Sequence, residues 1–480
     1  MSGPAGSTAS ARPTASLERR LGPLDAAAIV VSNVIGTGIF FVPILVAGLV
    51  PTGFGMLGLW LLGGLLAFAG AMAYAELAAL RPHAGGEYVY LRDAYGPVVA
   101  FLTGWTSFVA GFSGAIAAGA VGLADYIGRF FPEAANRVPL FTVPIPFAPL
   151  VVTPQAIVAI TAIIGLSLVH VSGLGPGRVV HNVLATLKVL ALVVFVALGL
   201  SIGTGSFGHL TAAHSVPAPA TGWLVAMIPI MFSYSGWNAA AYVAEEIRDP
   251  GRNVPIALAL GTGAVVLLYL LLNTLYLYAL PPAELGSLLS QGKGLTDVVA
   301  QRLFGGVAGT LLALLTTASI AASISAMVLA GPRVYYAMAR DGVFPHAVAR
   351  VHTRFRTPAI AIATQAVWSS ILVLSGTLAG LVNYTGFAVM LFAGIAVLSV
   401  FVLRRRQSAA ERPFNAWGYP WAPAIFVAAS LFMVAYNLYT NQFGERYGLA
   451  IIFAGLPLYY LFARGTTKTE QKPLPDAVES

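Results

Sequence analysis

Long apolar segments separated by short polar ones run along almost the whole chain. A helix that crosses a bilayer needs about 20 mainly apolar residues, and twelve segments meet that requirement. The pattern therefore predicts an all-α polytopic membrane protein with twelve transmembrane helices. The predicted spans are residues 24–50, 54–79, 97–123, 153–171, 180–203, 222–243, 255–279, 306–331, 358–376, 380–403, 421–439 and 447–463.

The composition excludes a soluble domain and thiol chemistry. Of the 480 residues, 58% are hydrophobic and 9% are charged, whereas soluble domains carry about 25% charged residues. Cysteine is absent from the chain, so disulfides, thiolate metal sites and a disulfide-linked partner subunit are excluded. The seven histidines form no His-x-x-x-His pattern, and we expect no metal centre and no cofactor.

The positive charges indicate the topology. The net charge of +8 is carried in short loops between the apolar segments, which is typical of membrane topology and not of nucleic-acid binding. With the N-terminus inside, 20 of the 26 cations are cytosolic, five are outside and Lys188 lies within a span. We therefore expect an integral protein of the cytoplasmic (inner) membrane with both termini in the cytosol.

The two ends of the chain differ from the apolar middle. The first 20 residues lack an apolar core, so we expect no cleavable signal peptide. Residues 1–23 and 464–480 are predicted to be disordered cytosolic tails.

The spacing of the spans predicts an internal repeat. The starts of spans 6 to 10 follow those of spans 1 to 5 by 198 to 209 residues. Because each unit holds five spans, an odd number, the second unit enters the membrane from the opposite side. We expect inverted repeats at residues 24–203 and 222–403, with residues 421–463 as two additional helices.

Corresponding spans of the two repeats carry matching interruptions. Span 1 contains Gly36 and Gly38, and Gly236 lies 200 residues after Gly36 in span 6. Such small residues can also serve only as packing surfaces, but paired breaks in an inverted repeat are typical of a transporter binding site. The predicted substrate-binding residues are Ile35, Gly36, Thr37, Gly38, Ile39, Phe232, Ser233, Tyr234, Ser235, Gly236, Trp237 and Asn238.

Two broken helices favour a substrate that carries one negative and one positive group. A half-helix that begins at a break presents N–H groups to a carboxylate, and one that ends there presents carbonyls to an ammonium. The acidic residues Asp25, Glu76, Asp125, Glu245 and Glu246 fall near predicted span ends. Since no acidic residue is central in a span, neutral amino acids fit better than polyamines.

Lys188 is the one ionisable residue well inside a span. Its long side chain could reach the cytosolic interface by snorkelling. Alternatively, its ammonium lies near free carbonyls of span 1 and hydroxyls of span 8 such as Ser323, in place of a sodium ion, and could carry a proton. Beside the second break, Phe232 is a candidate gate that closes over substrate.

These segments together resemble the amino acid/polyamine/organocation superfamily, and within it the L-type amino acid transporters. The resemblance implies the sodium-symporter-like (LeuT-type) fold with unwound helices 1 and 6. It also implies that Lys188 matches the span 5 lysine of sodium-independent members and Phe232 their gating aromatic. The segments that carry it are Ile35–Phe40, Phe232–Asn238, Glu245–Pro255, Arg333–Pro345 and Arg412–Phe414.

The expected function is secondary active transport of amino acids by alternating access, as sodium-independent exchange or with protons, and neutral L-amino acids are favoured. The alternative is a same-fold transporter of cationic amino acids, polyamines or other amines. Animal L-type transporters pair with a glycoprotein through a cysteine, which this chain lacks. A receptor or structural role stays open, but an enzyme is not expected, since only His170 and His181 approach a span.

Overall fold

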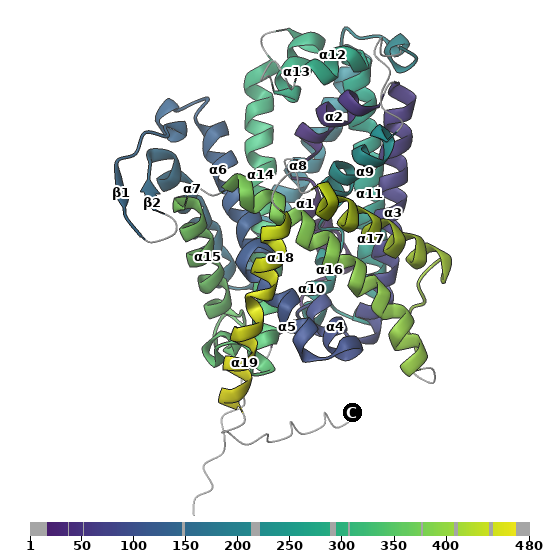
Figure 1. Cartoon of the computed structure of the whole chain (residues 1–480). Helices are drawn as coiled ribbons and strands as arrows, with labels where there is room; N and C mark the ends of the chain where they lie inside the picture. The colour runs from purple at the N-terminus through teal and green to yellow at the C-terminus, as the bar shows by residue number, and fades with distance from the viewer. Residues whose placement is uncertain are drawn as a thin grey trace, which may run out of the picture.

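In a computed structural model of the chain, the described residues are 17–36, 38–50, 52–145, 149–212, 221–288, 294–305, 308–375, 378–407, 411–440 and 445–466. They are almost entirely helical (Figure 1). The α-helices are α1 Pro23–Val34, α2 Gly38–Leu49, α3 Gly53–Leu80, α4 Glu87–Tyr95, α5 Pro97–Thr106, α6 Phe112–Ile127, α7 Pro154–Val171, α8 Leu174–Ser201, α9 Gly222–Tyr234, α10 Ala239–Tyr242, α11 Pro250–Ala279, α12 Pro282–Ser287, α13 Leu295–Phe304, α14 Ala308–Arg340, α15 Ala359–Leu374, α16 Leu378–Arg406, α17 Trp421–Thr440, α18 Glu445–Phe453 and α19 Gly455–Thr466.

The apolar helices follow the predicted spans. Among the described residues, eight helices are long and apolar enough to cross a membrane, and the bent pair α1 and α2 raises the number to nine. Three shorter apolar helical segments coincide with the other predicted spans, at Gly222–Tyr234, Ala359–Leu374 and Gly448–Phe462. The chain is thus an all-helical polytopic membrane protein.

Both expected interruptions are present as breaks between helices. Predicted span 1 is divided into α1 and α2, which are bent by 48° relative to each other. Predicted span 6 is divided into α9 and the short α10. Around these breaks, α1 packs against α8, α11 and α14, while α9 packs against α2 and α3. The breaks therefore lie inside the bundle.

Two spans differ in detail from the prediction. Predicted span 3 is α5 and α6 joined by a π-helical segment at Ser107–Gly111, a distortion that is frequent at functional sites. Predicted span 8 was expected to end at residue 331, before Pro332, but α14 continues to Arg340 with Pro332 inside it. The Arg333 side chain in this continuation donates to the Leu329 carbonyl. A side chain thus supplies a hydrogen bond to a backbone carbonyl near the proline.

The polar ends of the bundle carry some structure of their own. The connection from 129 to 153 contains the antiparallel strands β1 Phe141–Val143 and β2 Leu150–Val152. Residues 17–22 belong to the predicted N-terminal tail, but Leu21 pairs with Ile247 and its N–H donates to the Glu246 carbonyl. This part of the tail is packed against the protein.

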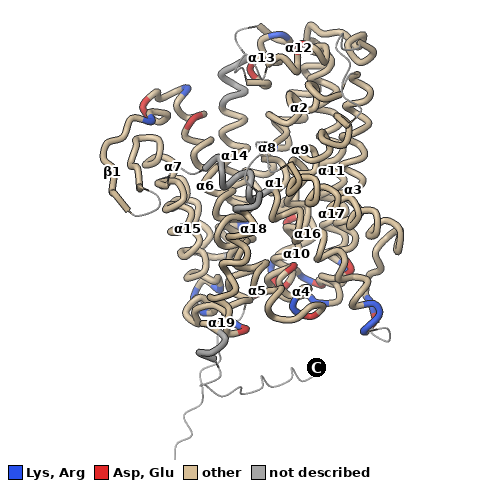
Figure 2. Tube along the Cα trace, viewed as in Figure 1, with Lys and Arg blue, Asp and Glu red and all other residues tan. Residues whose placement is uncertain are grey.

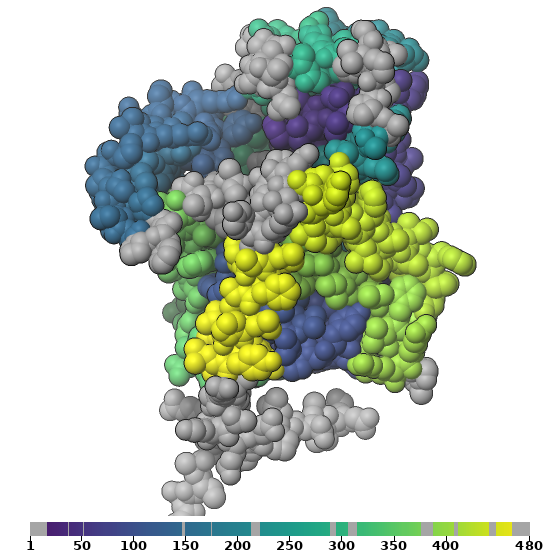
Figure 3. Space-filling view, viewed as in Figure 1, coloured from purple at the N-terminus to yellow at the C-terminus, as the bar shows by residue number. Residues whose placement is uncertain are grey.

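Most charged residues lie toward the two ends of the bundle (Figure 2). At the end that carries α4 and α19, Glu246 and Arg333 form a fully buried ion pair with a closest distance of 2.6 Å. Glu76, also buried, pairs with Arg404 at 2.6 Å. Both acids fall near the ends of predicted spans, where a solvated or loop-anchoring role is the usual expectation, and the structure instead buries them in ion pairs. In the view of Figure 3 the C-terminal helices α17 to α19 cover the centre and lower part of the visible face.

Candidate functional site

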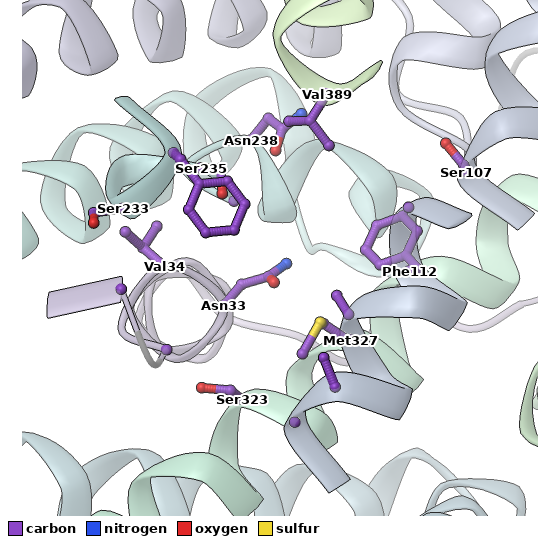
Figure 4. A pocket seen from close by; sticks show the side chains of 18 of the residues that line it. Asn33, Val34, Ser107, Phe112, Ser233, Ser235, Asn238, Ser323, Met327 and Val389 are labelled. Atoms are coloured by element: carbon purple, nitrogen blue, oxygen red, sulfur yellow. The ribbon is translucent and has the colours of Figure 1, made fainter. Parts of the chain in front are cut away.

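A cavity of about 200 Å³ lies where the two breaks meet (Figure 4). Its wall combines the α1–α2 break, the α9–α10 break, the π-helical part of the third span and one face of α14. The residues that line it are Asn33, Val34, Gly36, Gly38, Glu87, Ser107, Gly111, Phe112, Ala115, Ala118, Gly119, Phe232, Ser233, Ser235, Gly236, Asn238, Tyr242, Ile320, Ser323, Met327 and Val389. This volume suits a small molecule the size of an amino acid.

At both breaks a glycine allows a close approach of the two broken spans that a larger residue would crowd. Gly236 has φ +97°, and a Cβ there would lie 3.1 Å from the backbone of Asn33. A Cβ at Gly38 would lie 2.7 Å from the Ser233 hydroxyl. The glycines let the two broken spans approach each other so closely that their free backbone groups face one cavity.

The breaks leave polar groups without partners. In the described part of the chain, the N–H groups of Gly236, Trp237 and Asn238 donate to no backbone carbonyl. The Ser233 hydroxyl is buried and likewise has no partner among the described residues. Ser233, Gly236 and Asn238 line the cavity, so their donors are available to an anionic or polar group.

Tyr269 of α11 links the two breaks. Its hydroxyl lies 3.0 Å from the carbonyl oxygen of Val34 and 3.1 Å from that of Ser233. Because a hydroxyl has one proton, it can donate to only one of these carbonyls at a time. Tyr269 thereby holds the end of α1 beside the end of α9, a role that no sequence pattern indicated.

Lys188 is fully buried and does not reach the membrane surface. Its ammonium donates to the carbonyls of Ser32 at 3.1 Å and Ile35 at 2.5 Å, and to the Ser323 hydroxyl at 2.8 Å. Ser323 also donates to the Ile35 carbonyl at 2.8 Å. The carbonyls released at the end of α1 are thus bound by a cation from α8 and a hydroxyl from α14.

Not every predicted site residue lines the cavity. Ile35 contributes its carbonyl to Lys188, and the Ile39 side chain is buried. Tyr234 donates to the Trp60 carbonyl at 3.0 Å, and Trp237 packs against Tyr74 and Phe426. Thr37 lies outside the described residues. Phe232, the candidate gate, and Gly36, Gly38, Ser233, Ser235, Gly236, Asn238 and Ser323 do line the cavity.

Sequence reasoning missed Glu87, the acidic group of the cavity. Glu87 is the first residue of α4, between predicted spans 2 and 3, and its carboxylate accepts a hydrogen bond of 2.7 Å from the Tyr74 hydroxyl. Burial raises its pKa to about 7, although hydrogen bonds from Tyr74 and Tyr242 act to lower it. A search for acids within spans cannot find it, but the positive φ available to Gly85-Gly86 indicates a sharp turn there.

Asn33 and the third span were also missed. Asn33 lies in the last turn of α1, and across the cavity Ser107 begins the π-helical segment and Phe112 follows it (Figure 4). The Ser107 carbonyl accepts a bond from Tyr335 and the Val109 carbonyl one from Trp368. A π-helical turn has no clear sequence signature, so only the structure indicates this wall.

The described histidines near spans form no catalytic site at the cavity. His170 of α7 lies 2.8 Å from the Ser325 hydroxyl of α14. Both residues are buried in the bundle and neither lines the cavity. A nucleophile needs access to its substrate, so this pair is a packing contact. Groups of three or more His, Asp or Glu that could hold a metal are also absent from the described residues.

The chain is similar to known proteins over almost its whole length. The family model for amino acid permeases matches residues 21–462. The serine/threonine exchanger SteT of Bacillus subtilis is 30% identical over 448 residues, covering 92% of this chain and 97% of that protein. The human cystine/glutamate transporter is 30% identical, covering 93% and 85%. The mouse b(0,+)-type amino acid transporter 1 is 28% identical, covering 94% and 89%.

Proposed function

The chain belongs to the amino acid permease family of the amino acid/polyamine/organocation superfamily, and on this premise we propose that it exchanges neutral L-amino acids across the cytoplasmic membrane without sodium. Members of this family transport amino acids and are not enzymes, so amino acid transport is its class of activity.

One observation carries the proposed substrate class, namely the meeting of both breaks at one cavity. The unpaired N–H groups at Gly236 and Trp237 suit the carboxylate of an amino acid. Tyr269 can donate to only one of the Val34 and Ser233 carbonyls at a time, so the other can accept from the ammonium of the amino acid, and the free Ser233 hydroxyl can bond either group. A zwitterion satisfies both sets of groups, and hydroxyls add no charge. Alternating access would then rock one group of helices about this site.

The proposed independence from sodium rests on Lys188. A sodium ion needs several oxygen ligands, and here the oxygens of Ser32, Ile35 and Ser323 are already bonded to an ammonium. An ammonium in this position binds the end of α1 as an ion would, without having to enter and leave the site. Exchange is further supported by SteT, which is named a serine/threonine exchanger.

The runner-up is transport of cationic amino acids or other amines. It was disfavoured because no acidic residue is central in a predicted span, but Glu87 brings a carboxylate to the cavity from a connecting helix. A cationic side chain could pair with it. The absence of an acid from the spans is therefore a weaker argument for neutral substrates than the sequence suggested.

The membrane arrangement is proposed with the function. Twelve spans, inverted five-helix units at 24–203 and 222–403, and both termini in the cytosol are consistent with the spacing of the helices and the loop charges. The paired breaks at corresponding places in the two units support the LeuT-type fold.

A substrate panel in proteoliposomes tests this proposal. Purified protein is reconstituted with internal leucine, and uptake of labelled leucine, serine, lysine and the diamine putrescine is compared with protein-free vesicles. We expect uptake of leucine or serine. Uptake restricted to lysine or putrescine supports the runner-up, and binding without uptake of any amino acid indicates a receptor.

A further inference from the structure

Building on the proposed exchange, we propose that Glu87 is a proton-binding site of the cavity, and that the cavity closes around its substrate only while Glu87 is protonated. The amino acid would still bind at the two breaks. The proton on Glu87 would decide whether the loaded cavity can become closed to water.

Glu87 is brought to the cavity by a tight glycine turn. Gly85 and Gly86 have φ of +111° and +52°, and a Cβ at Gly86 would lie 2.6 Å from the Tyr242 ring. This close approach places the first residue of α4 beside α10. The Glu87 side chain lines the cavity although the residue is only 7% exposed.

The carboxyl group is held by neutral donors. Tyr74 of α3 donates at 2.7 Å, and the Asn238 amide nitrogen lies at 3.5 Å from the same oxygen. Asn238 also donates to the Tyr242 hydroxyl at 3.1 Å. In the described part of the chain Glu87 has no ion pair, unlike the buried acids Glu76 and Glu246. A buried carboxylate with no cation is costly when it is ionised.

Charged groups on the elements around Glu87 are paired elsewhere. From α14, Arg333 pairs with Glu246 and Arg340 with Glu245, and Asp341 beyond its end pairs with Arg92 of α4. Asp93 pairs with Arg92 and with Arg81, which lies just after α3.

The arginines of α16 are also held away from Glu87. Arg404 pairs with Glu76, Arg406 donates to the Ala94 carbonyl and Arg405 is exposed. Helix α5 has no charged residue, and the titratable groups that face Glu87 are Tyr74, Tyr90 and Tyr242.

Glu87 also contacts the part of the protein that must move. Asn238 and Tyr242 belong to the second break and to α10, the half-helix that follows it. Closing the cavity removes water from Glu87, which favours the neutral acid, while opening it rehydrates the carboxylate. With a pKa raised by burial to about 7, this change of charge falls within the physiological range. Proton binding at Glu87 and closure of the cavity would thus be linked.

The pH dependence of exchange tests the proposal. In proteoliposomes with equal pH on both sides, the wild-type rate should fall several-fold between about pH 6 and about pH 8, with a midpoint near 7. Glu87→Gln mimics the protonated acid and should give a flat profile over this range. The control Asp93→Asn changes an acid of the same helix that is ion-paired outside the cavity, and should keep the wild-type midpoint.

A wild-type rate that does not titrate, or a Glu87→Gln profile with the wild-type midpoint, overturns the proposal. Selective loss of lysine uptake in Glu87→Gln, with the pH profile of leucine exchange unchanged, also overturns it and assigns Glu87 to substrate charge. Absence of amino acid exchange in the wild type contradicts the proposed function instead.

A second measurement covers a Glu87→Gln variant that fails to transport. Infrared difference spectra of purified protein between about pH 6 and about pH 8 report carboxyl groups that lose a proton in this range. A protonated-carboxyl band that titrates near 7 in the wild type and in Asp93→Asn, but is missing in Glu87→Gln, supports the proposal. The same band in all three proteins, or in none, contradicts it.

Discussion

The Lys188 ammonium and the Ile35 carbonyl oxygen lie 2.5 Å apart across the break between α1 and α2. Ile35 is the C-cap residue that follows the last residue of α1, Val34, so this bond joins α8 to a carbonyl that the helix itself leaves free. The proposed mechanism without sodium depends on this contact.

Removing Lys188 should therefore abolish exchange. In Lys188→Ala the Ser32 carbonyl loses its charged donor, which costs about 1–3 kcal/mol for a buried group. Ser323 can still donate to the Ile35 carbonyl. We expect a transport rate reduced by at least about tenfold and a lower melting temperature in detergent. Lys188→Met, which keeps most of the volume, should be as inactive as Lys188→Ala if the charge matters. Transport at the wild-type rate in either variant excludes Lys188 from the mechanism.

Gly236→Ala should lower both stability and transport. Its φ of +97° is unfavourable for a residue with a Cβ, and that Cβ would meet the Asn33 backbone at 3.1 Å. We expect a loss of about 1–3 kcal/mol, seen as a lower melting temperature. Gly263→Ala in α11 is the matched control, because a Cβ there meets nothing within 4 Å. Equal melting temperatures of the two variants would contradict this account of the break.

Phe232→Ala should slow turnover more than it weakens binding. Phe232 lines the cavity and precedes the second break, and a gate acts when the cavity closes. The maximal exchange rate should fall about tenfold or more. Binding affinity, measured as the substrate concentration that gives half of the full increase in melting temperature, should change less. The control is Phe432→Ala, which removes a ring that is 45% exposed on α17. An equal loss of binding and turnover would make Phe232 a binding residue.

The Arg333–Glu246 pair should contribute strongly to stability. The two side chains are 2% and 0% exposed, and removing one partner of a buried pair leaves an uncompensated charge at a cost of about 3–5 kcal/mol. Arg333→Met should lower the melting temperature far more than Arg137→Met, whose exposed pair with Asp125 is worth about 0–1 kcal/mol. A double variant Arg333→Met with Glu246→Leu should recover part of the loss. Additive losses would show that the two side chains do not act as a pair.

The stability of the protein should decrease as pH rises toward neutrality because of Glu87. The unfolded chain releases this proton near the ordinary pKa of 4.5, and burial raises the folded-state pKa to about 7. Between these values the folded state holds more protons, so its free energy of unfolding falls as pH rises, by at most about 3 kcal/mol. Melting curves of Glu87→Gln should show a smaller decrease over this range than those of the wild type. Parallel curves would contradict the raised pKa.

Much of the fold could be predicted because its signals are local. Apolar runs of the length of a bilayer indicate the spans, and Gly36 and Gly236 indicate the breaks that the structure has at both places. Lys188 was notable because an ionised side chain is rare within a span. Such features need no knowledge of which helices are neighbours.

The rest of the site depends on tertiary contacts that no local pattern encodes. Tyr269 is one of several tyrosines in an apolar helix, and only its position between Val34 and Ser233 gives it a role. Glu87 lies in a connecting segment that reads as a polar loop, yet the turn at Gly86 directs it into the cavity. The side chains of Trp237 and Tyr234 lie in the packing around the second break and not in the cavity, which their place beside a break in the sequence does not reveal.

Uptake of labelled leucine or serine into proteoliposomes, with and without internal amino acid and with and without sodium, tests sodium-independent exchange at the paired breaks most directly. We expect rapid uptake only when amino acid is present inside, at the same rate in sodium and in potassium, and little uptake by Gly236→Ala. Uptake that needs a sodium gradient, or that ignores the internal amino acid, would contradict the proposed mechanism.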